Sequence, residues 1–196
     1  MSTITLRPLH ADDSMDDLTA MLRRAFAPLG ASGLNCTCVN QTSAVTRQRI
    51  GLGDCLVALS GSRIVGTVTL QTADPQAEIG WYRNPDVASL HQLAVEPCHH
   101  GKGIGAALLR AAERWALVHG CSALALDTPE PARHLRAYYA RQGFWQRSTV
   151  QLADRTYRSA VLGKPLRRAL GAPGRDAWPA RHPAEMALLA KQMRSH

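Results

Sequence analysis

The stretch SLHQLAVEPCHHGKGIGAALLRAAERWA (89–116) decides the fold of this 196-residue chain. Its first seven residues predict a buried strand, which Glu96-Pro97 ends. A glycine-rich turn follows, and apolar side chains at helical spacing then predict a helix over 103–119. Glycines at a helix start let free backbone N–H groups approach an anion closely, and Lys102 adds a positive charge. This pattern therefore favours a bound diphosphate.

The composition indicates a single globular domain with a short appendage. Hydrophobic residues make up 45% of the chain and charged residues 19%, which is too apolar for a disordered protein. No apolar run approaches the roughly 20 residues that cross a bilayer, and the N-terminus lacks a secretion signal. We therefore expect a cytoplasmic protein without membrane contacts. The five cysteines are odd in number and unevenly spaced, so we expect free thiols and no metal site.

The net charge of +8 is concentrated at the C-terminal end. Residues 1–154 hold 14 Lys and Arg against 13 Asp and Glu, whereas residues 155–196 hold 9 against 2. We expect one domain over 4–166 and a basic extension over 167–196, in which residues 183–194 predict an amphipathic helix. This helix is expected to dock on the domain or to mediate a homodimer. A charge excess outside the domain argues against nucleic acid as the substrate.

The remaining pattern predicts alternating strands and helices on either side of the central stretch. A hairpin precedes the central strand, so we expect the neighbouring part of the sheet to be antiparallel. The predicted elements are a strand at 4–10, a helix that begins near Ser14 and ends at Pro28 and Gly30, a short helix at 43–52, a hairpin at 55–71, a loop at 72–88, a strand at 122–128, a helix at 131–142 and a closing hairpin at 145–166.

Two kinds of phosphate-binding fold compete for the glycine-rich turn. Gly101, Gly103 and Ala106 satisfy the dinucleotide pattern G-x-G-x-x-A, and Asp127 lies where that fold has its ribose-binding acid. Five residues separate the strand from Gly101, however, where the dinucleotide turn follows its strand at once. The chain after Asp127 is also too short for further βαβ units and a substrate domain. We therefore do not favour a dinucleotide fold.

The turn instead resembles the coenzyme A motif of the GNAT family of N-acetyltransferases. That motif is Gln/Arg-x-x-Gly-x-Gly/Ala, after a strand that ends in a Leu-Ala-Val-like triplet. Here the triplet is Leu93-Ala94-Val95, the glycines are Gly103 and Gly105, and His100 stands where Gln or Arg is usual. The diphosphate is held mainly by main-chain N–H groups in such a turn, so this departure matters little.

A second motif supports the same resemblance, which covers the chain from about Ile4 to Leu166. The run from Tyr139 to Phe144 is similar to the family's Tyr-x-x-x-Gly-Phe. Where the family often has an Asn seven residues before that Tyr, this chain has Ala132. Either motif alone is weak, but their order and the elements between them together identify the chain as similar to the family.

The resemblance implies an α/β (α+β) fold with a mixed, mostly antiparallel sheet flanked by helices. Its central strands are expected to splay apart and to admit the pantetheine arm of acetyl-CoA, which would pair with the backbone of the strand. No metal is expected. The residues expected to bind the coenzyme are Leu93, Ala94, Val95, His100, Gly101, Lys102, Gly103, Ile104, Gly105 and Ala106.

The resemblance also implies direct attack of an amine on acetyl-CoA, without a nucleophile from the protein. Tyr139 is the expected general acid, since a phenol stays protonated at pH 7. Its neighbour Tyr138 is expected to pack in the core. His91 lies two residues before Leu93, so we expect both on one side of the strand, with His91 as the base.

Other assignments of the base stay open. His91 could instead be a buried side chain bonded to a backbone carbonyl. Glu78, Glu96 or an ordered water could then take the proton, although Glu96 follows the strand and is expected to face solvent.

The acceptor is expected to be a primary amine of a small molecule or a peptide, bound by segments near 26–50 and 148–160. Two other classes of function stay open. A degenerate family member could bind acyl-CoA as a sensor without turnover. The basic extension could also mark a nucleic-acid-associated protein.

Overall fold

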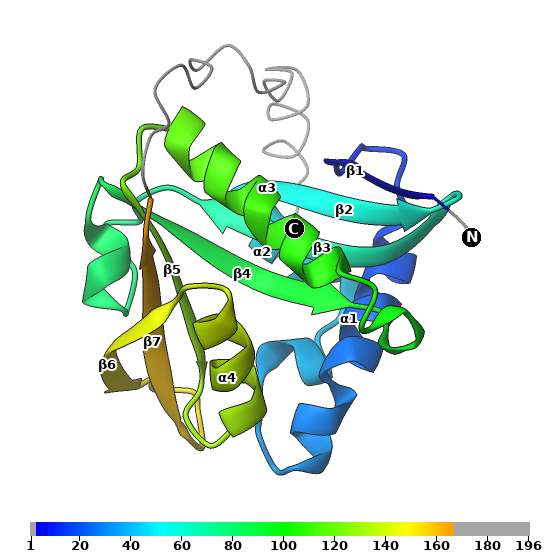
Figure 1. Ribbon diagram of the computed structural model, residues 1–196. Helices are drawn as coiled ribbons and strands as arrows, with labels where there is room; N and C mark the ends of the chain where they lie inside the picture. Colours follow the sequence, from blue (N-terminus) through cyan, green and yellow to red (C-terminus); the bar gives the residue numbers. More distant parts are fainter. Residues whose placement is uncertain (1–2, 167–196) are drawn as a thin grey trace, which may run out of the picture.

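The computed structural model describes residues 3–166, which form one sheet with helices on both faces (Figure 1). The predicted extension over 167–196 and its helix lie outside the described residues. The strands are β1 (Ile4–Pro8), β2 (Asp54–Ser60), β3 (Arg63–Gln71), β4 (Val87–Val95), β5 (Ala123–Pro129), β6 (Trp145–Gln151) and β7 (Arg158–Pro165). The helices are α1 (Met15–Ala31), α2 (Ser43–Gly51), α3 (Ile104–Val118) and α4 (Arg133–Arg141), with short 3-10 turns η1 (Thr37–Val39), η2 (Gly80–Arg83) and η3 (Pro97–His99).

The seven strands lie in the order β1-β2-β3-β4-β5-β7-β6. The β4–β5 pair is parallel, and all other neighbouring pairs in this sheet are antiparallel. The predicted mixed, mostly antiparallel sheet is therefore confirmed. The closing hairpin also forms, with β7 inserted between β5 and β6. The loop expected over 72–88 contains η2, and β4 begins at Val87, two residues earlier than predicted.

The two central strands separate along their length, as the resemblance implied. The β4–β5 ladder consists of Val87 with Ala123, Ala88 with Leu124 and Ser89 with Ala125. Beyond Ser89 the two strands diverge, as Figure 1 shows. The second half of β4 therefore has its backbone unpaired on the side that faces β5.

A β-bulge interrupts β4 at the level of this separation. Thr67 of β3 pairs with Ala94, but Thr69 pairs with His91, so two residues of β4 face a single residue of β3. Gln92 in the bulge has a φ of 52°, a left-handed conformation that is uncommon for residues other than glycine. The extra residue reverses the side-chain alternation of the strand beyond it.

This reversal makes one sequence-based expectation wrong. Leu93 packs into the core under α3, together with Leu90. His91 lies on the opposite face, where it contacts Ser89 and Tyr82. His91 and Leu93 are therefore not on one side of β4, because the simple alternation of a strand does not hold across a bulge.

Two apolar cores hold the sheet from its two faces. Leu108, Leu109 and Trp115 of α3 pack against one face, and Leu18 and Met21 of α1 lie in the core on the other. All five are at most 2% exposed. Burial of each such side chain contributes about 1.5–3 kcal/mol, so these contacts keep β3 and β4 rigid beneath the site. Within residues 3–166, no helix is long and apolar enough to cross a membrane.

The end of α1 lies further along the chain than the sequence predicts. Pro28 is inside the helix, which continues to Ala31. A proline in the last turn removes only one helical hydrogen bond, and its own carbonyl accepts from the backbone N–H of Ser32 at 3.2 Å. The helix therefore passes Pro28 and brings Leu29 to the site described below.

Candidate functional site

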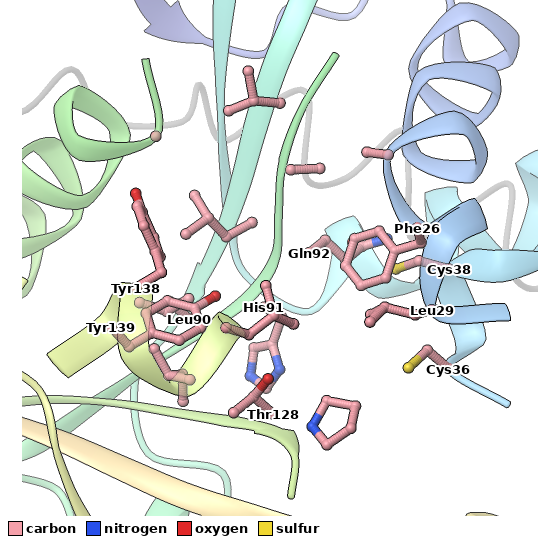
Figure 2. A pocket seen from close by; sticks show the side chains of 18 of the residues that line it. Phe26, Leu29, Cys36, Cys38, Leu90, His91, Gln92, Thr128, Tyr138 and Tyr139 are labelled. Carbon is pink, nitrogen blue, oxygen red and sulfur yellow. The ribbon is translucent and has the colours of Figure 1, made fainter. Parts of the chain in front are cut away.

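A cavity of about 780 Å³ opens where β4 and β5 diverge (Figure 2). Its walls come from β4, the ends of β5 and α4, the start of α3, and the α1–η1–α2 segment. The cavity brings together His91, Tyr139 and nine of the ten residues expected to bind the coenzyme. The exception is Lys102, which is exposed and does not line it.

The turn at one end of the cavity has the backbone expected of an anion site. Gly101 and Gly103 have φ values of 74° and 78°, which glycine adopts without the steric cost other residues meet. Gly103 precedes the first residue of α3, and no side chain caps the helix start. The free N–H groups and the helix dipole therefore favour an anion there.

Two further contacts shape this end of the cavity. The Nε2 atom of His100 lies 2.9 Å from the carbonyl oxygen of Val95, which ties the turn to the end of β4. A Cβ atom at Gly105 would lie only 2.7 Å from the Tyr138 hydroxyl. Glycine at position 105 therefore lets α4 lie close to α3.

The two tyrosines of α4 have different surroundings. Tyr139 is the more deeply buried one, 8% exposed, and its ring packs edge-on against Phe144. Its hydroxyl points toward Leu90 and His91 in Figure 2. Burial raises the pKa of Tyr139 far above its ordinary value, so the hydroxyl stays protonated at pH 7. Tyr138 is half-buried and packs against the core under α3, as expected, with its hydroxyl beside Gly105.

His91 lies deep in the cavity with a neutral partner. Its Nε2 atom is 2.9 Å from the Ser89 hydroxyl, and its ring meets the Tyr82 ring edge-on at 5.7 Å between centroids. Burial lowers the pKa of His91 to about 4, although Asp127 acts in the opposite direction. The imidazole is therefore neutral at pH 7. Its side-chain partner is a hydroxyl, not the backbone carbonyl considered above.

Asp127 is a cavity residue that sequence reasoning did not assign to this site. It lies near the end of β5, and the Tyr82 hydroxyl donates to its Oδ1 atom at 3.2 Å. Its position was visible in the sequence as a carboxylate in the otherwise apolar run at 123–127. Tyr82 carried no such signal, because it comes from η2 within the predicted loop.

The two glutamates considered as bases do not line the cavity. Glu96 is 8% exposed, not solvent-facing as expected, and it forms a two-point ion pair with Arg24 whose shortest distance is 2.7 Å. Arg24 lowers the pKa of Glu96, so the Glu96 carboxylate binds a proton poorly at neutral pH. Glu78 is exposed and accepts the backbone N–H of Ala153 at 2.9 Å. Neither carboxylate is placed to accept a proton from a bound ligand.

Hydrogen bonds join the two segments expected to shape the acceptor site, both of which line the cavity. The Asn35 side chain donates to the carbonyl of Asp154 at 2.7 Å and accepts from the backbone and hydroxyl of Thr156, both at 3.0 Å. Arg155 donates to the Thr37 hydroxyl at 2.6 Å. We call this set of contacts the acceptor bridge, and two of its residues, Thr37 and Arg155, line the cavity.

The cysteines of the chain are reduced in the structure, and two of them lie at the site. All five cysteines are free, as predicted; Cys98 is exposed and the other four are buried. Cys36 and Cys38 line the cavity. Burial raises the pKa of both thiols, which makes them poor nucleophiles. Within residues 3–166, no three His, Cys, Asp or Glu side chains lie close enough to hold a metal ion.

The family model that matches this chain and the solved structures that resemble it all indicate the same acetyltransferase fold. The model of the Acetyltransferase (GNAT) family matches residues 34–144. No curated protein matches the sequence significantly. Among solved structures, the acetyltransferase of GNAT family from Streptococcus pneumoniae is 20% identical with a TM-score of 0.59, over 84% of this chain and 99% of that chain.

Two more solved structures have the same architecture. The ribosomal-protein-S18-alanine N-acetyltransferase from Escherichia coli is 15% identical with a TM-score of 0.62, over 87% of this chain and 99% of that chain. A GNAT family acetyltransferase from Elizabethkingia anophelis with acetyl-CoA bound is 16% identical with a TM-score of 0.60, over 83% of this chain and 98% of that chain. Identities this low show a shared fold.

Proposed function

Because the chain belongs to the GNAT family of acetyltransferases, we propose that it transfers an acetyl group from acetyl-CoA to the nitrogen of a primary amine. The observation that carries this proposal is the cavity between the diverging strands β4 and β5. It holds the glycine turn, the unpaired backbone of β4, Tyr139 and His91 together.

The residues present fit acetyl-CoA. The backbone of Leu93 and Val95 lies beyond the last β4–β5 pair, so its amide groups can pair with the pantetheine amides like an added strand. His100 uses one lone pair of the Val95 carbonyl, and the second remains available. The diphosphate would be held by N–H groups of the turn over 100–106, with the exposed Lys102 side chain supplying charge from outside.

The base would act on the attacking amine and the acid on the departing thiolate. The amine nitrogen bonds to the acetyl carbon, and the carbon–sulfur bond breaks. His91, neutral at pH 7, accepts the proton that the nitrogen loses, and Asp127 stabilises the imidazolium as it forms. Tyr139 donates its hydroxyl proton to the departing thiolate. Proton exchange with solvent restores both side chains.

We also propose the class of acceptor, the compartment and the role of the C-terminal extension. The acceptor is a small-molecule or peptide amine, the protein acts in the cytoplasm, and the extension over 167–196 is not needed for catalysis. No membrane and no nucleic acid takes part.

An acetylation assay with a panel of amines, read by release of free thiol, tests the proposed function. We expect calorimetric binding of acetyl-CoA and thiol release that requires an amine. Tight binding of acetyl-CoA without thiol release with any amine would instead favour the acyl-CoA sensor. A salt-sensitive gel shift with nucleic acid would favour the third class.

A further inference from the structure

Two side chains of opposite charge line the cavity without pairing with each other. Arg49 extends from α2, and Asp127 lies near the end of β5. Neither forms an ion pair within residues 3–166. Burial is the main cause of the low pKa of His91, but Asp127 raises that pKa and Arg49 lowers it further. Both charges therefore lie near the ring assigned as the base.

The guanidinium of Arg49 is held in place by neutral partners. Its Nη1 atom donates to the Cys38 thiol at 3.2 Å and to Oε1 of Gln41 at 2.8 Å. Arg155 also lines the cavity, but its charge is paired with Asp154 at 2.8 Å. An anion that enters the cavity therefore finds its uncompensated partner at Arg49, where a charge-assisted hydrogen bond can form.

A second hydrogen-bond donor lies beside Arg49. Gln92 is 5% exposed, its Oε1 atom accepts from the Thr69 hydroxyl at 3.2 Å, and its Nε2 atom forms no hydrogen bond to an oxygen or nitrogen acceptor within the described residues. Gln92 and Arg49 both hydrogen-bond toward the Cys38 thiol, and each opposes the rise in its pKa that burial causes. Sulfur is a weak acceptor, so the buried Nε2 donor of Gln92 can still donate to a stronger acceptor such as an anionic oxygen. Figure 2 shows Gln92 directed from β4 toward Cys38.

The part of the cavity beside Asp127 suits a cation. The Asp127 carboxylate accepts one hydrogen bond, from Tyr82, and its remaining lone pairs can accept from an ammonium group. His91 is close enough to this carboxylate for its pKa to respond, so an amine bound there would be near the base. Thr37 and Arg155 of the acceptor bridge line the same cavity, so the bridge borders the space that the ligand would occupy.

We infer that the acceptor is a small dipolar molecule, an amine that also carries a carboxylate or similar anionic group. Arg49 and the Nε2 atom of Gln92 bind the anionic group, and Asp127 binds the amine before His91 takes its proton. An apolar body fits between Phe26, Leu29 and Leu135, which line the same cavity. This inference rests on the proposed function, because it names the substrate class of the same site.

Two matched series of amines test the inference. One is leucine, leucinamide and 3-methylbutylamine, and the other is 5-aminopentanoate, 5-aminopentanamide and pentylamine. Only the acid of each series carries the anion, and rates are compared per neutral amine so that different amine pKa values do not decide the result. We expect kcat/KM for the acid to exceed that for its amide by about 10- to 100-fold in at least one series.

Variants of Arg49 test whether this residue causes the preference for the acids. Arg49→Gln should remove the preference for the acid, because it should raise the KM of the acid by a larger factor than the KM of the amide, and Arg49→Lys should keep part of the preference. Arg47→Gln is the matched control, because Arg47 is an exposed residue of the same helix and does not line the cavity. Calorimetry with acetyl-CoA checks that each variant is folded.

Two kinds of result would contradict the dipolar acceptor, and only the second would also contradict the proposed function. Thiol release without any preference for the acids, or a preference that survives in Arg49→Gln, would overturn the dipolar acceptor and leave the proposed function standing. Thiol release with no amine of any kind, despite bound acetyl-CoA, would overturn the proposed function and this inference together.

Discussion

Tyr138 and Tyr139 are consecutive in α4, yet their hydroxyl groups lie against different parts of the site (Figure 2). Tyr139→Phe removes only the proposed proton donor, so acetyl-CoA binding should survive. Turnover should fall by about 10²–10⁴-fold, the usual contribution of a general acid. Tyr138→Phe is the matched control and should change turnover only a few-fold. Wild-type turnover by Tyr139→Phe with chemistry limiting, or a large loss in Tyr138→Phe, would move the acid to another group.

Gly61 and Gly103 also form a matched pair at the scale of single residues. Their φ values are 63° and 78°, and a Cβ atom at either would meet nothing within 4 Å. Valine at each should therefore cost a similar backbone strain, about 1–2 kcal/mol. Only Gly103→Val should also weaken acetyl-CoA binding, by more than about tenfold, since it displaces the N–H groups of the turn. Calorimetry and urea unfolding measure the two effects, and equal coenzyme affinity in both variants would contradict the assignment of the turn.

At the scale of elements, the acceptor bridge joins Asn35 and Thr37, which lie just before and at the start of η1, to the connection between β6 and β7. Asn35→Ala removes three of its hydrogen bonds, which we expect to weaken the bridge by about 1 kcal/mol. The ratio of kcat/KM for a bulky amine to that for a small one should then rise about fivefold. Asn40→Ala is the control, because Asn40 is an exposed neighbour outside the cavity. An unchanged ratio in Asn35→Ala would show that the bridge does not limit acceptor size.

At the scale of the whole molecule, the buried His91 ties stability to pH. Its pKa is 6.5 when unfolded and about 4 when folded, so between these values the unfolded chain binds the extra proton. Stability contributed by the neutral ring is therefore present above pH 6.5 and is lost as the pH falls toward 4. Between pH 7 and pH 5 this should cost about 2 kcal/mol.

Urea unfolding of the wild type and of His91→Gln measures this contribution. The wild type should lose about 2 kcal/mol more than the variant between pH 7 and pH 5. Asp13 and Glu96 have pKa values lowered by ion pairs with Arg7 and Arg24, and they destabilise both proteins equally at still lower pH. The same pH dependence in both proteins would show that His91 is not the buried neutral ring described here.

Local patterns in the sequence were enough to predict the order of elements and the glycine-rich turn before α3. The positive φ values of Gly101 and Gly103 depend on the absence of a side chain, and α3 follows from apolar residues at helical spacing. The divergence of β4 and β5 came from the resemblance to the family, since no local signal in either strand marks the residue where the ladder ends.

Only the tertiary structure decided how the side chains of the site meet. The direction of His91 depends on a bulge that pairing with β3 creates, and the ion pair of Glu96 depends on Arg24, 72 residues away. The Tyr82–Asp127 contact spans 45 residues, and the contact of Arg155 with Thr37 spans 118. Such contacts form because burial of the two apolar cores brings distant segments together, and residue spacing along the chain carries no record of that packing.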